Sequence, residues 1–304
     1  MMQGTQTLPL AQRLPITEGL LLLVAIFWGT SYGLTKSALF YTSALMFITL
    51  RFSITALVLL PLVVRDFKAG LNKDWVVALP TGAILSAIFL CEVFGVAHTT
   101  ASNAAFLISL CVLFTALAEV LVNRQKVAWS LVLLCVASVV GVLLLTGSDG
   151  ARVDFTLGDY LILLAALLRA LMVTTTKRLS LGRAVTTTTL TAIQSAVVAG
   201  VAAILLLSTL PQSQWHLPTE STFWVTLLYL VAFCTLFAFY VQNYAVRRTS
   251  PTRVALLMGS EPLFGALFAM LWLQETFTFA QSLGAGLILF SVMLTSLRRE
   301  SGQH

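Results

Sequence analysis

The chain has 304 residues, of which 58% are hydrophobic and only 10% are charged, and its formal net charge is +6. An ordinary soluble domain carries roughly 25% charged residues, so this composition excludes a water-soluble globular protein. In lipid every backbone N–H and C=O must be paired within the protein, which favours helices. The sequence shows no ten-residue alternating segments of the kind that build a membrane β-barrel. We therefore predict an all-α membrane protein.

Ten apolar segments follow one another along the chain, each close to the roughly 20 residues that one helical crossing needs. Short loops join them, and no soluble insertion interrupts the series. In chain order we place the crossings at 18–38, 43–64, 75–97, 101–122, 127–147, 157–178, 186–208, 222–244, 252–273 and 279–297. The sequence thus predicts ten transmembrane helices.

The positions of Lys and Arg predict how the chain sits in the bilayer. If the N-terminus is cytoplasmic, fourteen of these residues fall in inner loops or termini and only Lys36 and Arg152 fall outside. Arg51 and Arg169 lie within helices. We therefore expect a multi-pass protein of the cell inner membrane with both termini cytoplasmic. The positive charge then meets anionic lipid headgroups and does not indicate a nucleic-acid partner.

An internal duplication is visible in the sequence. Residues 98–122 align without a gap on 248–272 with eight identities, among them Thr99/Thr249 and Phe114/Phe264. A Thr-Lys pair also ends the first helix of each half, at 35–36 and 176–177. We expect two five-helix halves, 18–147 and 157–297. Because five crossings is an odd number, the second half is inverted relative to the first, and such repeats enclose a central cavity near the membrane midplane.

Several phrases resemble the ten-helix EamA-type exporters of the drug/metabolite transporter superfamily. The longest is "QNYAVRRTSPTRVALLMGSEPLFGALFAMLWLQET" (Gln242–Thr276). Others are "FWGTSYGLTK" (Phe27–Lys36), "LRFSITALVL" (Leu50–Leu59) and "TTASNAAFL" (Thr99–Leu107). The chain departs from the family pattern at Arg169, where a Trp is common. The resemblance implies a secondary transporter that exports small metabolites, such as amino acids or related amphipathic compounds, by alternating access.

Charged residues inside helices usually face the interior of the bundle or a wet cavity. Arg169 and Glu261 both fall near the midplane, so they either pair or face the same cavity. In the functional interpretation Arg169 attracts a substrate carboxylate, and Glu261 takes a substrate amine or a coupling proton. In the alternative they form an ion pair that locks helices together. We expect Arg51 and Glu92, both in the outer half, to form a structural charge pair.

Polar and aromatic residues add further candidates for a substrate site. Trp28 and Tyr32 are spaced i, i+4 and share one helix face, where they offer aromatic walls. The polar candidates near helix ends are Asn103, Gln242 and Asn243, of which the last two alternatively cap or bridge helices.

We also expect a helix kink at Pro262, because a proline within a helix lacks the N–H that the helix needs. The kink would line the cavity, or alternatively serve packing alone.

The sequence lacks several motifs that would indicate other functions. It contains no Walker A motif, no selectivity filter, and no GxSxG or HExxH motif. The three histidines are scattered along the chain, so we expect no metal site, no cofactor and no enzyme activity. The remaining alternatives are an uptake or exchange carrier and a non-transporting membrane component. A homodimer is also left open.

Overall fold

The computed structural model describes residues 10–99, 101–124, 126–146, 155–211, 217–265, 267 and 278–297, without the side chains of 10–15, 101–103, 145–146 and 296–297. Within these ranges the chain forms helices and turns and no strand. The all-α prediction is therefore confirmed. The later part of the expected crossing at 252–273 lies outside the described residues.

The first half contains α1 (Leu10–Ala38), α2 (Ala44–Lys68), the short 3₁₀ turn η1 (Trp75–Val77), α3 (Ala78–His98), α4 (Ala101–Ser109), α5 (Cys111–Asn123) and α6 (Trp129–Thr146). The second half contains α7 (Leu157–Ser180), α8 (Thr187–Thr209), α9 (Ser221–Val231), the π-helical turn η3 (Ala232–Phe237), α10 (Ala238–Val246), α11 (Pro251–Met258), helical residues 261–265 and α13 (Phe279–Leu297). Among the described residues, seven helical segments are long and apolar enough to cross a membrane, and two shorter apolar helices lie at Trp129–Leu144 and Phe279–Thr295.

Hydroxyl side chains fix where several of these helices begin. Ser43 accepts a hydrogen bond from the backbone N–H of Met46, and Thr186 accepts one from Thr189. Thr156 and Asp159 form a reciprocal capping box at the start of α7. Such caps pair N–H groups that the first helical turn leaves without partners. The caps therefore fix the first residue of each of these helices, close to the start predicted for the corresponding crossing.

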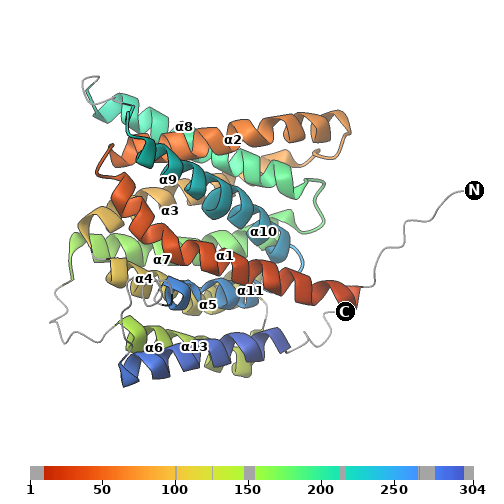
Figure 1. Ribbon diagram of the computed structural model, residues 1–304. Coiled ribbons are helices and arrows are strands. Elements are labelled where there is room, and N and C mark those ends of the chain that lie inside the picture. Colours follow the sequence, from red (N-terminus) through yellow and green to blue (C-terminus); the bar gives the residue numbers. More distant parts are fainter. Residues whose placement is uncertain are drawn as a thin grey trace, which may run out of the picture.

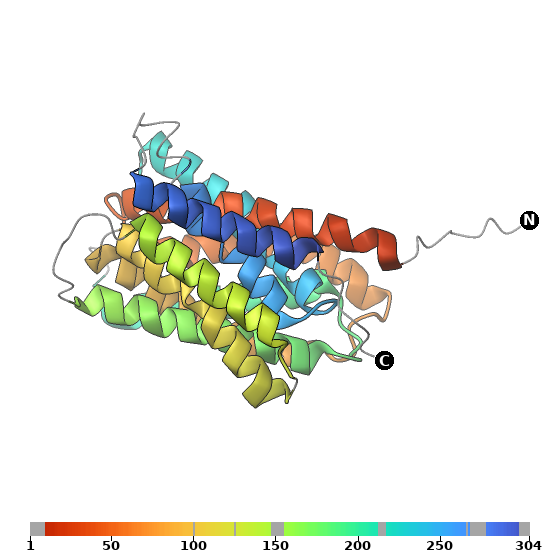
Figure 2. The ribbon, with the colours of Figure 1, turned by 90° about the horizontal axis from the view of Figure 1, so that it is seen from below.

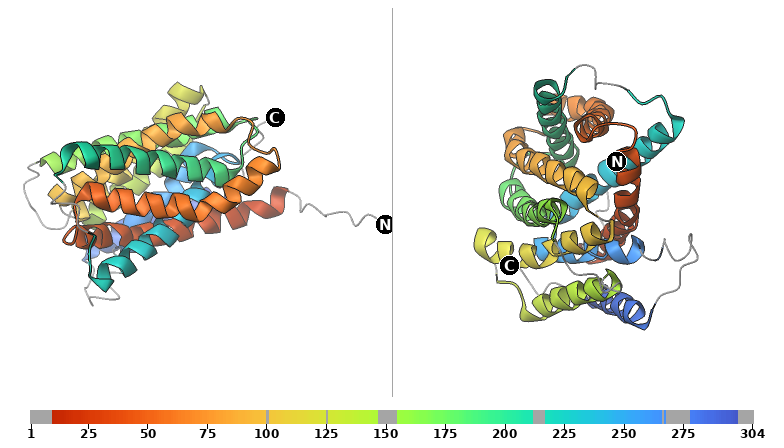
Figure 3. Two further views of the ribbon diagram at one scale, coloured as in Figure 1. Left: turned by 90° about the horizontal axis from the view of Figure 1, so that it is seen from above. Right: turned by 90° about the vertical axis from the view of Figure 1, so that its left-hand side faces the viewer.

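The two halves enter the bundle from opposite ends. In Figure 1, α1 begins at the right-hand end and α13 ends there, whereas α7 begins at the left-hand end. The second half is thus inverted relative to the first, as five crossings per half require. Helices α6 and α13 lie side by side as a separate pair, in the foreground of Figure 2. In the end-on view of Figure 3, α3 lies between α8 and α7 and packs against both.

Two of the predicted crossings are interrupted rather than continuous. The helix expected at 101–122 is broken at Leu110, and the helix expected at 252–273 is broken at Gly259 and Ser260. At each break a serine hydroxyl donates to the carbonyl three residues earlier, Ser109 to Phe106 at 2.6 Å and Ser260 to Leu257 at 2.7 Å. Such local bonds compete with the helical pattern.

The two breaks fall at equivalent places in the two halves. The gapless alignment of the repeat sets Leu110 opposite Ser260. The interruption at Gly259 and Ser260 lies in the turn directly before Pro262, the turn that a proline within a helix disrupts. Pro262 is the second residue of the resumed helix, where a missing N–H has no helical partner to lose.

Candidate functional site: a cavity between the two halves

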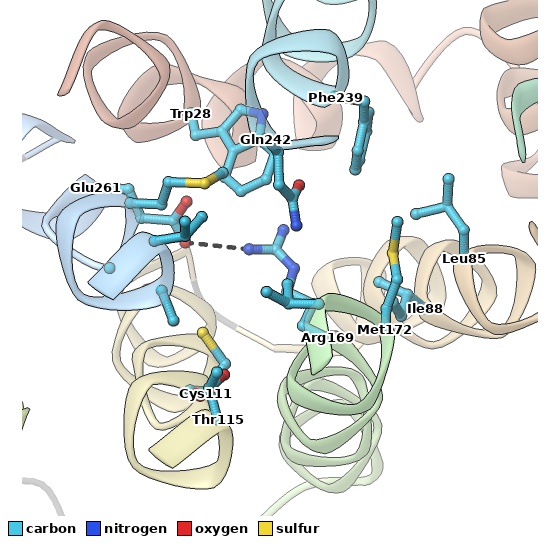
Figure 4. Close-up of a pocket in the computed structure, with 15 residues that line it drawn as sticks. Trp28, Leu85, Ile88, Cys111, Thr115, Arg169, Met172, Phe239, Gln242 and Glu261 are labelled. Atoms are coloured by element: carbon cyan, nitrogen blue, oxygen red, sulfur yellow. Dashed lines mark hydrogen bonds and ion pairs between the residues drawn. The ribbon is translucent and has the colours of Figure 1, made fainter. Parts of the chain in front are cut away.

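A small cavity lies at the centre of the bundle, where both halves meet. It is built by α1, α3 and α5 of the first half and by α7, α10 and α11 of the second (Figure 4). Its volume is about 30 Å³, room for about two water molecules. Its lining consists of Trp28, Leu85, Ile88, Cys111, Thr115, Arg169, Met172, Val173, Phe239, Gln242, Val254, Ala255, Met258, Gly259 and Glu261. In this conformation the cavity is too small for a metabolite.

Arg169 is the charged centre of this cavity. Its Nη2 lies 2.8 Å from Glu92 Oε2, and its Nη1 lies 3.6 Å from Glu261 Oε1. Figure 4 shows the guanidinium extending from α7 toward Glu261. The structure thus brings together Arg169 and Glu261, which the sequence placed at similar depth. Glu92 joins them from α3 but does not line the cavity.

An aromatic side chain covers the guanidinium. The Arg169 Cζ lies 4.6 Å from the centroid of the Trp28 ring, within the range of a cation–π contact. The indole Nε1 of Trp28 donates to the carbonyl of Cys234 at 3.0 Å, which fixes the ring. Trp28 is therefore a wall of the cavity and an electrostatic partner of Arg169.

Glu261 is held by the second aromatic candidate and by close helix packing. The hydroxyl of Tyr32 donates to Glu261 Oε1 at 3.0 Å, and Tyr32 itself is buried. One turn earlier, Gly29 packs directly on the resumed helix, since a Cβ there would lie 2.7 Å from the Glu261 carbonyl and from the Gly265 nitrogen. The backbone of α1 therefore touches the helix start that carries Glu261, a position where the helix dipole favours a negative charge.

Equivalent residues of the two halves meet in and beside the cavity. Trp28 and Arg169 each stand eight residues before the lysine of their Thr-Lys pair. The alignment of 98–122 with 248–272 continues backward without a gap to Phe89 and Phe239, whose rings meet edge to face with centroids 5.8 Å apart. The same alignment pairs Glu92 with Gln242 and Cys111 with Glu261. The framework of the cavity is thus symmetric, whereas its charges are not.

The predicted charge pair of Arg51 and Glu92 is wrong. Arg51 Nε donates to Thr235 Oγ1 at 2.7 Å, and its Nη2 donates to the Cys234 carbonyl at 3.3 Å. Both acceptors belong to η3, where the π-helical turn leaves backbone carbonyls without their usual α-helical partners. Glu92 instead binds Arg169. Arg51 therefore fastens α2 to η3 and lies outside the cavity lining.

The three polar candidates have different positions. Gln242 lines the cavity. Asn243, its neighbour, donates to Thr191 Oγ1 at 3.0 Å and to Gln194 Oε1 at 2.8 Å, so it bridges α10 to α8. Asn103 is in α4, but its side chain lies outside the described residues.

Sequence reasoning did not identify several apolar lining residues. Phe239, Met172 and Cys111 face the cavity, but residues of these types are common in any lipid-facing or buried helix. The repeat offers the one usable signal, since Phe239 is the equivalent of Phe89. Among the side chains that the structure describes, no group of three or more His, Cys, Asp or Glu residues is arranged to hold a metal ion.

A scan against protein-family models matches the EamA-like transporter family twice, over residues 16–147 and again over 156–297. The chain belongs to the EamA-like transporter family. This member is similar to an uncharacterized transporter of Archaeoglobus fulgidus, with 30% identity over 91% of this chain and 85% of the relative. A crystal structure whose title names no function matches with a TM-score of 0.77 at 16% identity, over 93% of this chain and 96% of that one, and so supports the fold.

Family membership assigns the general activity of the chain. It is a multi-pass membrane transporter and not an enzyme, and it acts on a small-molecule substrate within a lipid bilayer. The two family matches, one to each half, agree with the two inverted five-helix repeats around the central cavity.

Proposed function

We propose that this transporter exports small metabolites, such as amino acids or related amphipathic compounds, across the cell inner membrane. Both termini are then cytoplasmic, and the halves 18–147 and 157–297 move against each other so that the cavity opens to one side at a time. The observation that carries this proposal is a cavity at the junction of two inverted repeats, lined by both a guanidinium and a carboxylate. Inverted-repeat transporters bind their substrates at this place.

In this proposal the residues of the cavity and of its surroundings have distinct roles. Arg169 attracts a substrate carboxylate, and Glu261 accepts a substrate amine or a coupling proton. Trp28 and Tyr32 shape the aromatic side of the site, and Gln242 offers a further polar contact. Asn243 acts indirectly by holding α10 against α8, and Asn103 remains a candidate at the start of α4.

The conformation described here fits a step between the two open states. The cavity has room for about two waters, so substrate enters only after helices have moved apart. The breaks at Leu110 and at Gly259 and Ser260 lie beside the cavity and divide two crossings into shorter rigid pieces. Such pieces allow one end of a crossing to move while the other stays packed.

Counterflow in proteoliposomes tests the proposal. Vesicles loaded with an unlabelled amino acid mixture should accumulate the labelled amino acid transiently and saturably. The variant Glu261→Gln should alter this exchange, whereas Glu220→Gln should not, because Glu220 is exposed at the start of α9 and makes no capping bond there.

The same assay separates the alternatives. Failure to exchange any of a broad set of metabolites would favour a non-transporting membrane component. If intact cells that contain the protein accumulate a metabolite instead of releasing it, the protein is an uptake carrier.

A further inference from the structure

Two buried oxygen atoms in the cavity have no partner among the described residues. They are Gln242 Oε1 and Glu261 Oε2. Buried polar atoms are almost always hydrogen-bonded, and leaving one unpaired costs free energy. Both residues line the same cavity, and Figure 4 shows their side chains converging on it from α10 and from the resumed helix. With Glu261 ionised, both atoms are acceptors, so the ligand that satisfies them must be a donor.

The charges around the cavity also favour a ligand that donates hydrogen bonds. Arg169 carries one positive charge, and two carboxylates contact it, those of Glu92 and Glu261. The cluster therefore has one excess negative charge. The ring of Trp28 covers the guanidinium as well, so the cation is already surrounded by partners.

The unpaired oxygen belongs to a carboxylate that lines the cavity, that of Glu261. Its other oxygen is taken up by Tyr32 and Arg169, and Glu92 does not line the cavity. Of the two carboxylates, Glu261 alone is thus placed to contact a ligand. The negative charge that Arg169 does not balance is therefore available inside the cavity.

We propose that the cavity is an ammonium site, in which a protonated amine of the transported substrate donates hydrogen bonds to Glu261 Oε2 and Gln242 Oε1. An ammonium group has three N–H donors and no acceptor, which suits two acceptors and a net negative charge. This inference rests on the proposed transport function and specifies its substrate: the amine is required and a carboxylate is not.

The rest of the lining suits the body of such a substrate. Trp28 and Phe239 present aromatic rings, and Leu85, Ile88 and Met172 are apolar. Aromatic faces attract cations as well as apolar groups. A ligand with a carboxylate and no amine would instead bring a second negative charge toward Glu261, and it would have to displace a partner of Arg169. The site should therefore reject it.

Three small molecules with the same aromatic ring test the inference. Phenethylamine is a cation, L-phenylalanine is a zwitterion and 3-phenylpropionate is an anion. Binding to the purified full chain in detergent is measured by titration calorimetry. Phenethylamine and phenylalanine should bind, and 3-phenylpropionate should bind more weakly by about tenfold or more, the scale of one charge-assisted hydrogen bond.

Variants assign the selectivity to the two oxygens. Glu261→Gln should weaken phenethylamine binding by about tenfold, and Glu220→Gln should leave it unchanged. Gln242→Leu should weaken binding, whereas Gln242→Glu should strengthen it by adding a second carboxylate. Gel filtration checks that each variant is folded, and the two Gln242 variants carry the test if Glu261→Gln fails to fold.

The ammonium site would be overturned if 3-phenylpropionate bound as tightly as phenethylamine, if none of the three molecules bound, or if phenethylamine affinity did not change in the variants. Counterflow separates this inference from the proposed function. Metabolite exchange without any preference for amines refutes the ammonium site and leaves transport in place. Amine binding without exchange of any metabolite supports the site and refutes transport.

Discussion

Lys36 and Lys177 make the same hydrogen bond at opposite ends of the molecule. Lys36 Nζ donates to the Thr99 carbonyl at 2.9 Å, and Lys177 Nζ donates to the Thr249 carbonyl at 3.2 Å. Each lysine belongs to the Thr-Lys pair of its half, and the two threonines are aligned by the repeat. The duplication thus extends to individual hydrogen bonds, one at the start of each interrupted crossing.

Acidic residues complete the arrangement at both ends. Asp159, at the start of α7, accepts a hydrogen bond from the Thr99 hydroxyl. Glu18 of α1 forms a buried ion pair with Arg253 of α11. The crossing that starts with α4 therefore begins between the last turn of α1 and the first turn of α7. The crossing that starts with α11 begins between the last turn of α7 and the first turns of α1. Both ends are fastened at once, in agreement with the small volume of the cavity.

We predict that the two lysine contacts open in turn during transport. Lys36→Met should favour opening at the end where α4 begins, and Lys177→Met should favour opening at the end where α11 begins. Cys111 lines the cavity and can report this in a variant whose other three cysteines are alanine. With an impermeant maleimide, the first substitution should speed labelling from outside and the second from inside.

Lys68→Met provides the matched control for this experiment, because Lys68 is exposed at the end of α2. Faster labelling from the same side in both lysine variants would contradict the alternating role of the two contacts.

The orientation of the chain is tested by single cysteines in the loops. The excess of Lys and Arg in alternate loops predicts that Lys68→Cys, Arg124→Cys, Arg183→Cys and Arg248→Cys label from the cytoplasmic side. Arg152→Cys and Gln214→Cys, which lie outside the described residues, should label from the other side. Labelling of positions 124 and 183 from outside intact cells would reverse the proposed topology.

Gly29 and Gly33 make a matched pair on α1. A Cβ at Gly29 would lie 2.7 Å from two backbone atoms of the helix that carries Glu261, whereas a Cβ at Gly33 has nothing within 4 Å. Gly29→Ala should therefore destabilise the protein by about 1–3 kcal/mol through overpacking. Gly33→Ala should be neutral or slightly stabilising, because alanine favours helix. Thermal unfolding in detergent measures both effects. Equal changes in stability for the two substitutions would contradict the close approach at Gly29.

Removing Arg169 should be more damaging than removing either of its carboxylate partners. Arg169→Gln leaves Glu92 and Glu261 together without a cation, and breaking a buried pair in this way costs about 3–5 kcal/mol. The double variant Arg169→Gln with Glu92→Gln should recover part of the lost thermal stability, since one carboxylate remains. Equal stability of Arg169→Gln and Glu92→Gln would show that the three charges do not form one cluster.

Arg51 and Thr235 should show energetic coupling. Each of Arg51→Met and Thr235→Val removes the 2.7 Å bond between the two residues, and a hydrogen bond to a charged group contributes about 1.5–3 kcal/mol. The double variant should therefore lose less stability than the sum of the single variants. Strict additivity in a double-mutant cycle would argue that Arg51 does not depend on the π-helical turn.

Hydropathy and charge predicted the number, order and inversion of the helices because the bilayer imposes length and loop charge directly on the sequence. They also predicted the depth of Arg169 and Glu261, since depth follows from position along a helix. Rotation about the helix axis is a different quantity. Arg51 and Glu92 share a depth, but most faces of their helices are apolar, and the sequence did not indicate that they point to different neighbours.

The helix breaks were hidden for a related reason. Ser109 and Ser260 bond to their own backbone, and a serine in a membrane helix has the same sequence signature whether it bends the helix or not. The proline at 262 was the visible signal in the second half, and the break lies in the turn directly before it. The gap-free repeat would have suggested a break at Leu110 only after the break near Pro262 was known.

The contact of Trp28 with Arg169 has a consequence for the origin of the molecule. Equivalent residues that touch must lie beside the axis that relates the two halves. In a homodimer of identical subunits that axis pairs each side chain with its own copy, giving Trp on Trp or Arg on Arg, and two guanidinium groups would repel each other there. A contact between two different residues at equivalent positions requires two copies of that position that can mutate independently. The charged centre of this cavity is therefore a feature that evolved only once the two ancestral units were encoded as distinct sequences.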